Sequence, residues 1–193
     1  MVLVLMGEAG AGKDSVQKEL VEKYGFTPIV STTSRPMRDG EIDGVHYNFT
    51  SRDEFFKLIA SDSLVEYRSY NTLVDGKPDT WYYGVEKRWL PAGINFVVIL
   101  DLDGARSFRE YYGEENCYTC YITADEIVRR ERAMHRGSFD ATEWNRRAES
   151  DTKVFNDADV ADIALTTIKT NGDLSACVDE IYFRYMMFVN LFL

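Results

Sequence analysis

The residues with the clearest chemistry lie between positions 31 and 49. Arg35 and Arg38 stand three apart in a polar segment that also contains turn glycines, an acid and Tyr47. A guanidinium group can hold a phosphate through two parallel, charge-assisted hydrogen bonds, and a tyrosine hydroxyl adds a neutral donor. We therefore predict that residues 31–49, which we call the clamp loop, bind a small phosphorylated anion.

A second pattern opens the chain. The apolar run Val2–Met6 leads directly into a glycine-rich stretch that ends in a lysine, and helical periodicity follows. This is the context of a P-loop, in which backbone N–H groups converge on phosphates and the lysine adds charge. A plain strand-to-helix turn, the alternative, has no use for the lysine. The predicted ATP-binding residues are Gly7, Glu8, Ala9, Gly10, Ala11, Gly12, Lys13, Asp14 and Ser15.

Three polar residues are candidate Mg²⁺ ligands. Asp14 occupies the place where a P-loop usually has Ser or Thr, and Ser15 follows it. An acid in the first turn favours the helix dipole, whereas a carboxylate can also replace the hydroxyl at Mg²⁺, and the sequence leaves both roles open. Asp101 ends an apolar strand, at the edge where open parallel sheets bind ligands, and we predict a water-mediated contact with the metal.

The two motifs together resemble the guanylate kinase family. Its monophosphate-binding signature, T-[ST]-R followed by a basic residue, an acid, a glycine and Y-x-[FY], is matched by Thr33-Ser34-Arg35, Arg38, Glu41, Gly44 and Tyr47-Asn48-Phe49. Further matches at residues 51–56, 64–67, 82–84 and 99–103 extend the resemblance over about residues 1–150. It implies a cytoplasmic enzyme that transfers the γ-phosphoryl group of ATP, with Mg²⁺, to GMP or dGMP.

The resemblance also implies a fold and a set of site residues. The fold is α/β, with a P-loop three-layer core and parallel sheet (1–33, 86–124 and 156–193), a β-rich monophosphate-binding subdomain (34–85) and a helical lid (125–155). The implied GMP-binding residues are Ser31, Arg35, Arg38, Tyr47, Glu66, Tyr83 and Asp103, and the implied catalytic residues are Lys13, Arg132, Arg136 and Arg147. Glu66 matches the carboxylate that accepts hydrogen bonds from guanine N1 and N2. The alternative role for Asp103 is to cap the helix that follows.

Phosphoryl transfer to a phosphate acceptor explains why the sequence shows no group of histidines or cysteines suited to catalysis. The acceptor oxygen is already anionic, so cationic donors and Mg²⁺ carry the catalysis and no general base is needed. Arg129, Arg130 and Arg146 are expected to form a solvated helical face instead. Cys117 and Cys120 lie three apart on a predicted strand, so they face opposite sides, and we expect ordinary reduced thiols.

Two features depart from the family pattern. Val85 occupies a position that normally carries a hydroxyl near the base, and valine cannot donate to guanine O6. Residues 71–81 are longer than the usual link and resemble a hairpin with an Asp-Gly turn. Our hypothesis is that this hairpin reshapes the acceptor pocket. Two alternatives stay open: a P-loop kinase for another phosphorylated small molecule such as ribose bisphosphate, and a non-catalytic guanylate-kinase-like binding module.

Composition narrows the partners. A net charge of −10 over 193 residues argues against a nucleic-acid or anionic-membrane surface. The first residues lack the basic region of a signal peptide, and the apolar stretch 185–193 is too short to span a bilayer. We expect that stretch to be the docking face of a helix or an oligomer contact. The expected partners are ATP and a guanine monophosphate.

Alternation of strands and helices predicts a parallel sheet with right-handed crossovers. Strands are expected at Val2–Met6, Thr27–Thr32, Ile94–Leu100, Tyr118–Ile122 and Asp162–Thr167, and helices at Asp14–Tyr24, Arg52–Ala60, Ala105–Tyr112 and Leu174–Phe192. A helical hairpin is expected between Asp125 and Phe155.

Overall fold

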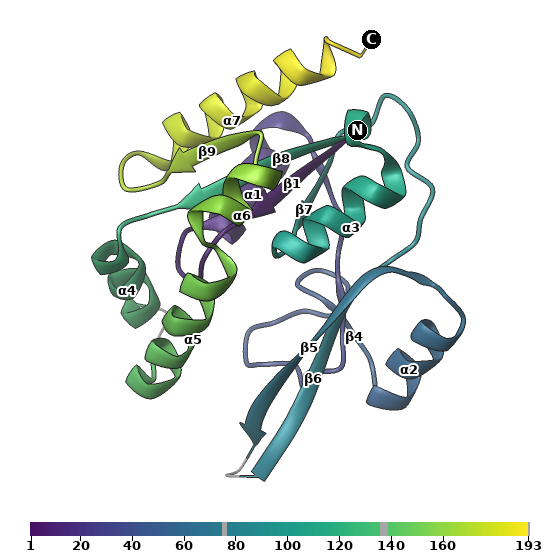
Figure 1. Ribbon diagram of the computed structural model, residues 1–193, viewed down its shortest axis with the longest axis vertical. Coiled ribbons are helices and arrows are strands. Elements are labelled where there is room, and N and C mark those ends of the chain that lie inside the picture. The colour runs from purple at the N-terminus through teal and green to yellow at the C-terminus, as the bar shows by residue number, and fades with distance from the viewer. Residues whose placement is uncertain (75–76, 136–138, 193) are drawn as a thin grey trace. The chain divides into compact units, whose positions relative to one another are not determined.

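A computed structural model describes residues 1–74, 77–135 and 139–192, apart from the side chains of Leu73, Glu143 and Arg147. The chain forms two compact units (Figure 1). Unit 1 comprises Met1–Pro28 and Ala92–Leu193, and unit 2 comprises Ile29–Pro91. None of the described helices combines the length and the apolar character that crossing a membrane requires.

Unit 1 is built on a five-stranded parallel sheet with the strand order β2-β7-β1-β8-β9. The strands are β1 (Val2–Met6), β2 (Thr27–Pro28), β7 (Phe96–Ile99), β8 (Cys117–Thr123) and β9 (Thr166–Lys169). All residues of the central strand β1 are buried, as expected for a parallel strand covered on both faces. The predicted α/β fold with a parallel sheet is confirmed.

Helices cover both faces of this sheet (Figure 1). Helices α1 (Lys13–Tyr24), α3 (Leu102–Tyr112) and α7 (Leu174–Val189) contact its strands, and α6 (Asp157–Ile163) packs against α3. Unit 1 also contains α4 (Glu126–His135) and α5 (Ala141–Val154), which lie beyond the sheet in Figure 1, and a short 3₁₀ turn, η1, at Glu114–Asn116. Helices α1 and α7 share one apolar cluster with Leu3, Leu5 and Cys120, whereas Cys117 donates to the Phe108 carbonyl of α3. The two cysteines therefore face opposite sides of β8, as predicted. Burial raises the pKa of Cys117 to about 12 and also raises that of Cys120, so both remain protonated thiols at neutral pH.

Unit 2 is a four-stranded sheet with the order β4-β3-β6-β5 and one helix. Its elements are β3 (Thr32–Thr33), β4 (Asn48–Phe49), α2 (Arg52–Ala60), β5 (Leu64–Val74) and β6 (Lys77–Glu86). Strands β5 and β6 form a long antiparallel hairpin, paired from Leu64 and Glu86 to Val74 and Lys77. This confirms paired strands within residues 71–81, while the predicted turn residues Asp75 and Gly76 lie outside the described part.

Two predicted strands are wrong in part. The single strand expected at Thr27–Thr32 is two short strands, β2 and β3, in different units. Residues 162 and 163 belong to α6, and β9 begins only at Thr166. The side chain of Asn156 caps α6 by accepting a hydrogen bond from the Asp159 N–H, a local helix signal that the sequence analysis missed.

Candidate functional site

The P-loop joins β1 to α1. Gly7 approaches β8 so closely that a Cβ atom there would lie 2.0 Å from the Ile122 carbonyl oxygen. Gly12 caps α1 with a left-handed φ of 98°, which a residue with a side chain rarely adopts. Lys13 begins the helix, and its Nζ donates to the Gly7 oxygen at 2.6 Å and the Glu8 oxygen at 3.0 Å. The lysine therefore lies across the loop, with its charge close to the backbone that would receive phosphates.

Arg129 is a residue of α4 that contacts the P-loop with its side chain. It is buried, and its Nη2 lies 2.9 Å from Glu8 Oε1, while Nη1 donates to the Ala9 oxygen at 3.3 Å. The Trp144 ring of α5 lies 6.0 Å from the guanidinium carbon. Burial raises the pKa of Glu8, and Arg129 opposes that rise. The expectation that Arg129 lies on a solvated face is wrong, because the carboxylate of Glu8 gives this arginine a buried partner.

Arg132, the predicted catalytic arginine of α4, also contacts the P-loop. Its Nη1 donates to Thr170 Oγ1 at 3.1 Å and to the Ala11 oxygen at 3.4 Å, and Nη2 donates to the Thr170 oxygen at 2.5 Å. Thr170 itself donates to the Ala11 oxygen at 2.6 Å, a contact that the sequence analysis missed. Of the other two predicted catalytic arginines, Arg136 lies outside the described residues, and Arg147 belongs to α5 but its side chain is also outside them.

An acidic side chain of α5 contacts the same loop. The Ala9 N–H donates to Asp151 Oδ2 at 2.6 Å. Backbone N–H groups of such a loop are anion-binding groups, so a carboxylate there is in a place suited to a phosphate oxygen. The sequence holds no signal for this contact, because the two residues are 142 positions apart.

We expect Asp151→Asn to tighten ATP binding by about three- to tenfold, because removing the charge ends repulsion with incoming phosphates and weakens a competing bond worth about 1 kcal/mol. Titration calorimetry with a non-hydrolysable ATP analogue measures this affinity. Glu149→Gln removes an exposed charge from the same helix and is the matched control. Equal affinities for the parent protein and the Asp151 variant would show that the carboxylate does not compete with nucleotide.

The predicted metal ligands lie at the starts of two helices of unit 1. Asp14 and Ser15 are exposed in the first turn of α1. Asp101 caps α3, since its Oδ1 accepts a hydrogen bond from the Gly104 N–H at 2.7 Å. Asp103 is the second residue of α3, so the capping role considered for it belongs to Asp101. Magnesium binding by these residues remains a prediction.

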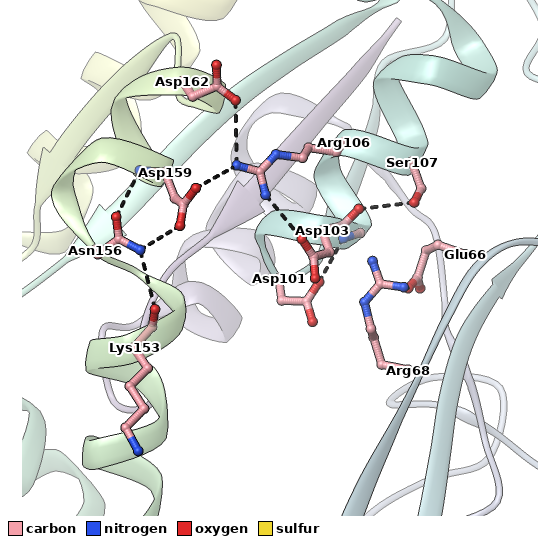
Figure 2. Close-up of polar contacts among 11 residues, drawn as sticks. Glu66, Arg68, Asp101, Asp103, Arg106, Ser107, Lys153, Asn156, Asp159 and Asp162 are labelled. Carbon is pink, nitrogen blue, oxygen red and sulfur yellow. Dashed lines mark hydrogen bonds and ion pairs between the residues drawn. The ribbon is translucent and has the colours of Figure 1, made fainter.

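Asp103 takes part in a polar network that joins α3 and α6 (Figure 2). Arg106 lies 3.1 Å from Asp103 and 3.1 Å from Asp159, and 3.5 Å from Asp162. The Asp103 side chain is 68% exposed despite this pairing. Its predicted contact with a nucleotide base stays a prediction.

The centre of the clamp loop is Arg35, which is only 3% exposed. Its Nη1 and Nη2 lie 2.9 and 2.8 Å from the two carboxylate oxygens of Glu41, and Nη1 also donates to the Pro36 oxygen. The Arg38 N–H donates to Glu41 at 2.7 Å, although the side chain of Arg38 is exposed. Burial lowers the pKa of Arg35, but its bonds, above all with Glu41, leave the pKa raised. The guanidinium fork is thus held by a carboxylate of its own loop.

Aromatic rings surround this guanidinium group. The Tyr47 ring centroid lies 5.3 Å and the Phe49 centroid 5.5 Å from the Arg35 carbon Cζ. The Tyr83 ring packs edge-on against Tyr47 at 5.8 Å, and the Tyr83 side chain helps to raise the pKa of Arg35. The structure therefore brings together three of the predicted phosphate-binding side chains. Ser31 is tied to the same strands, because its carbonyl accepts the Asn48 N–H at 2.9 Å.

Glu41 should make the stability of the protein depend on acid. The hydrogen bonds with Arg35 lower the pKa of Glu41 below its ordinary value of 4.5. Its stabilising contribution is therefore complete above the unfolded-state pKa and is lost as the pH falls through the lower, folded-state pKa. We expect Glu41→Gln to reduce the free energy of unfolding by about 2 kcal/mol at pH 7. In urea denaturation the gap between parent and variant should narrow below about pH 4.5, and a constant gap would contradict the assignment.

The hairpin of unit 2 carries the predicted base-recognition residue. Glu66 is 8% exposed, and its partner across the strands is the fully buried Val85. Arg68 Nη1 lies 3.9 Å from Glu66 Oε2 (Figure 2). Glu66 and Val85 are among the residues singled out from the sequence, whereas Arg68 is not. The two-residue spacing on a strand, which puts side chains on one face, is the signal that could have found it.

Comparisons with known proteins agree with this geometry. The family model for guanylate kinase matches residues 1–153. The guanylate kinase of Lactobacillus delbrueckii subsp. bulgaricus is 32% identical over 184 residues, which is 93% of this chain and 88% of that protein. That of Chlorobaculum tepidum is 30% identical over 197 residues, covering 97% and 93%.

Among solved structures, guanylate kinase from Anaplasma phagocytophilum superimposes with a TM-score of 0.67 at 22% identity, over 97% of this chain and 85% of that one. A gluconokinase from Sinorhizobium meliloti 1021 gives 0.52 at 20% identity, over 99% and 95%. These two likenesses concern the fold. The match of the family model over most of the chain, together with relatives of 30% identity or more, shows that this chain belongs to the guanylate kinase family.

Proposed function

We propose that this protein transfers the γ-phosphoryl group of ATP to GMP or dGMP, giving ADP and GDP or dGDP. Family membership makes it a nucleoside monophosphate kinase. The observation that carries the choice of acceptor is that unit 2 combines a phosphate clamp around Arg35 with a buried carboxylate, Glu66. A monophosphate at one end and a base with N–H donors at the other would satisfy both groups.

ATP would bind at the P-loop of unit 1. Backbone N–H groups of residues 7–15 would surround its phosphates, and Lys13 would turn from the Gly7 and Glu8 carbonyls to the phosphate oxygens. Asp14 and Ser15 suit Mg²⁺, since both present oxygen atoms from an exposed helix start, and Mg²⁺ favours few protein oxygens with phosphates and waters. When bound, the metal would neutralise charge on the phosphates.

GMP would bind to unit 2. Its phosphate would take hydrogen bonds from Arg35, Arg38, Tyr47 and Tyr83, so Arg35 would share its fork between Glu41 and the ligand. Glu66 would accept hydrogen bonds from guanine N1 and N2. Ser31 and Asp103 are the further contacts that we infer from the family resemblance.

The chemical step needs no proton transfer by the protein. An oxygen of the GMP phosphate attacks the γ-phosphorus, the bond between that phosphorus and the β,γ-bridging oxygen breaks, and ADP leaves with the electron pair. Negative charge spreads over the transferring oxygens, so cationic side chains stabilise the transition state. We assign that role to Lys13, Arg132, Arg136 and Arg147.

These assignments imply three functional parts. We propose residues 34–85 as the monophosphate-binding subdomain, 125–155 as the lid and the rest as the core. A cytoplasmic location is the natural one for an enzyme of this substrate pair, since cells make and use ATP and GMP there.

A coupled assay of ADP release tests the proposal with GMP, dGMP, AMP, UMP and ribose phosphates as acceptors. Saturable turnover restricted to guanine monophosphates is the expected result. Turnover with a ribose phosphate alone would favour a kinase for another phosphorylated molecule. ATP binding without turnover of any acceptor would point to a non-catalytic binding module.

A further inference from the structure

One face of the β5–β6 hairpin carries four side chains of unlike chemistry. Glu66 and Arg68 are two apart on β5, and their partners across the strands are Val85 and Tyr83. Residues directly opposite in an antiparallel pair share a face, so all four point to the same side of the hairpin. The other face is taken by α2, because a Cβ on Gly84 would lie 3.1 Å from the Phe55 ring.

The phosphate clamp fixes the direction in which a nucleotide would lie on this face. The Tyr83 ring packs against Tyr47, whose ring centroid lies 5.3 Å from Arg35 Cζ, so the phosphate end is next to Tyr83 on β6. Glu66 and Val85 come two residues farther along their strands, at about 7 Å. A bound guanine base would therefore lie beside the carboxylate, the valine and the neighbouring Arg68.

Guanine presents two chemically different edges to such a site. N1–H and the N2 amino group donate hydrogen bonds and suit the carboxylate of Glu66. O6 and N7 accept hydrogen bonds and need a donor, which Val85 cannot supply because its side chain is an alkyl group. A guanidinium group is the commonest specific partner of guanine O6 and N7.

Arg68 is placed to be that donor. Its Nη1 lies 3.9 Å from Glu66 Oε2 and donates to the Tyr67 carbonyl at 2.7 Å (Figure 2). A guanidinium group has five N–H donors, so it can serve several acceptors at the same time. The side chain is 28% exposed and that of Glu66 is 6% exposed, so both charges are partly removed from water and interact strongly with a ligand.

We propose that Arg68 reads O6 of the guanine base and thereby sets the base specificity of this kinase. This inference rests on the proposed function. Adenine has an amino group at position 6 and an unprotonated N1, so it would place a donor against Arg68 and an acceptor against Glu66. Rejection of AMP then follows from leaving both charged side chains without partners.

The test measures kcat/KM of the parent and of Arg68 variants with three acceptor nucleotides. With GMP, Arg68→Ala should lower kcat/KM by about 10- to 100-fold, the range expected for losing one bidentate base contact. With 6-thio-GMP, whose sulfur is a poor acceptor, the same substitution should cost less than about threefold. With IMP, which keeps O6 but lacks the N2 amino group, Arg68→Ala should lower kcat/KM by as large a factor as with GMP. Arg68→Lys, with a single ammonium group, should fall between the parent and Arg68→Ala.

A second substitution separates base recognition from a structural role. Val85→Thr keeps the shape of the buried side chain and adds a hydroxyl donor, so it should restore part of the GMP activity in the Arg68→Ala background but not the 6-thio-GMP activity. Arg52→Ala is the matched control, since it removes an arginine that pairs with Asp79 on the same hairpin. Its kcat/KM for GMP should stay within about twofold of the parent. Calorimetric GMP affinities and melting temperatures accompany each variant.

Several outcomes would overturn the inference. Equal losses with GMP and 6-thio-GMP would make Arg68 a structural partner of Glu66, and no loss at all would remove it from base recognition. If the parent enzyme itself does not phosphorylate GMP, the proposed function fails first. If the parent enzyme is active and the Arg68 substitution lowers kcat/KM equally with every acceptor, the proposed function stands and only the role of Arg68 is rejected.

Discussion

Replacing Lys13 by alanine is expected to lower kcat for GMP phosphorylation by about 100- to 1,000-fold, the range seen when one preorganised donor is removed from a transition state. Lys13 Nζ is held across the P-loop by the Gly7 and Glu8 carbonyls at 2.6 and 3.0 Å, so its charge is in place before ATP arrives. Negative charge on the β- and γ-phosphate oxygens is largest in the transition state. The loss should therefore appear mainly in kcat, as measured by coupled ADP release.

Lys18→Ala is the matched control for this experiment. Lys18 is on the same helix, its side chain is 72% exposed, and its ion pair with Glu22 spans 3.8 Å. An exposed pair of this kind adds little stability, so kcat should change by less than twofold. A Lys13 variant that kept the parental kcat would rule out ATP chemistry at the P-loop.

Arg35→Ala is expected to lower kcat/KM for GMP by about 100- to 1,000-fold, because it removes the buried fork that would hold the acceptor phosphate. The same change should lower the free energy of unfolding by about 3 kcal/mol, since it leaves the Glu41 carboxylate without its bidentate partner. Steady-state kinetics and urea denaturation measure the two losses separately. ATP affinity, which depends on residues of unit 1, should not change.

The double variant Arg35→Ala/Glu41→Gln separates stability from binding. Neutralising Glu41 removes the unpaired charge, so most of the stability should return while kcat/KM stays low. Arg184→Ala is the control for losing an arginine, because Arg184 pairs with Glu180 on the exposed side of α7. Recovery of kcat/KM in the double variant would mean that Arg35 supports the fold of the clamp loop and does not hold the phosphate.

The parts of this protein that depend on neighbours along the chain can be predicted from residue type and spacing. An apolar strand, closely spaced glycines and a lysine defined β1, the P-loop and the start of α1. The clamp loop was also readable, because Arg35, Glu41 and Tyr47 lie within 13 positions. The Asp-Gly turn predicts the paired strands in residues 71–81. In each case the backbone conformation and the contacts are local, so residue type and spacing carry the information.

Which charged side chains are buried, and what they contact, depends on how distant segments pack together. The arginine-rich sequence around Arg129 predicts a solvated helical face, yet Arg129 is buried against Glu8, 121 positions away. Asp151 and Ala9 are similarly remote. The spacing of two residues puts Arg68 on the face of Glu66, but only the pairing of β5 with β6 sets Val85 and Tyr83 opposite them. Burial and register arise from the meeting of distant segments, and that meeting is set by the packing of the whole chain.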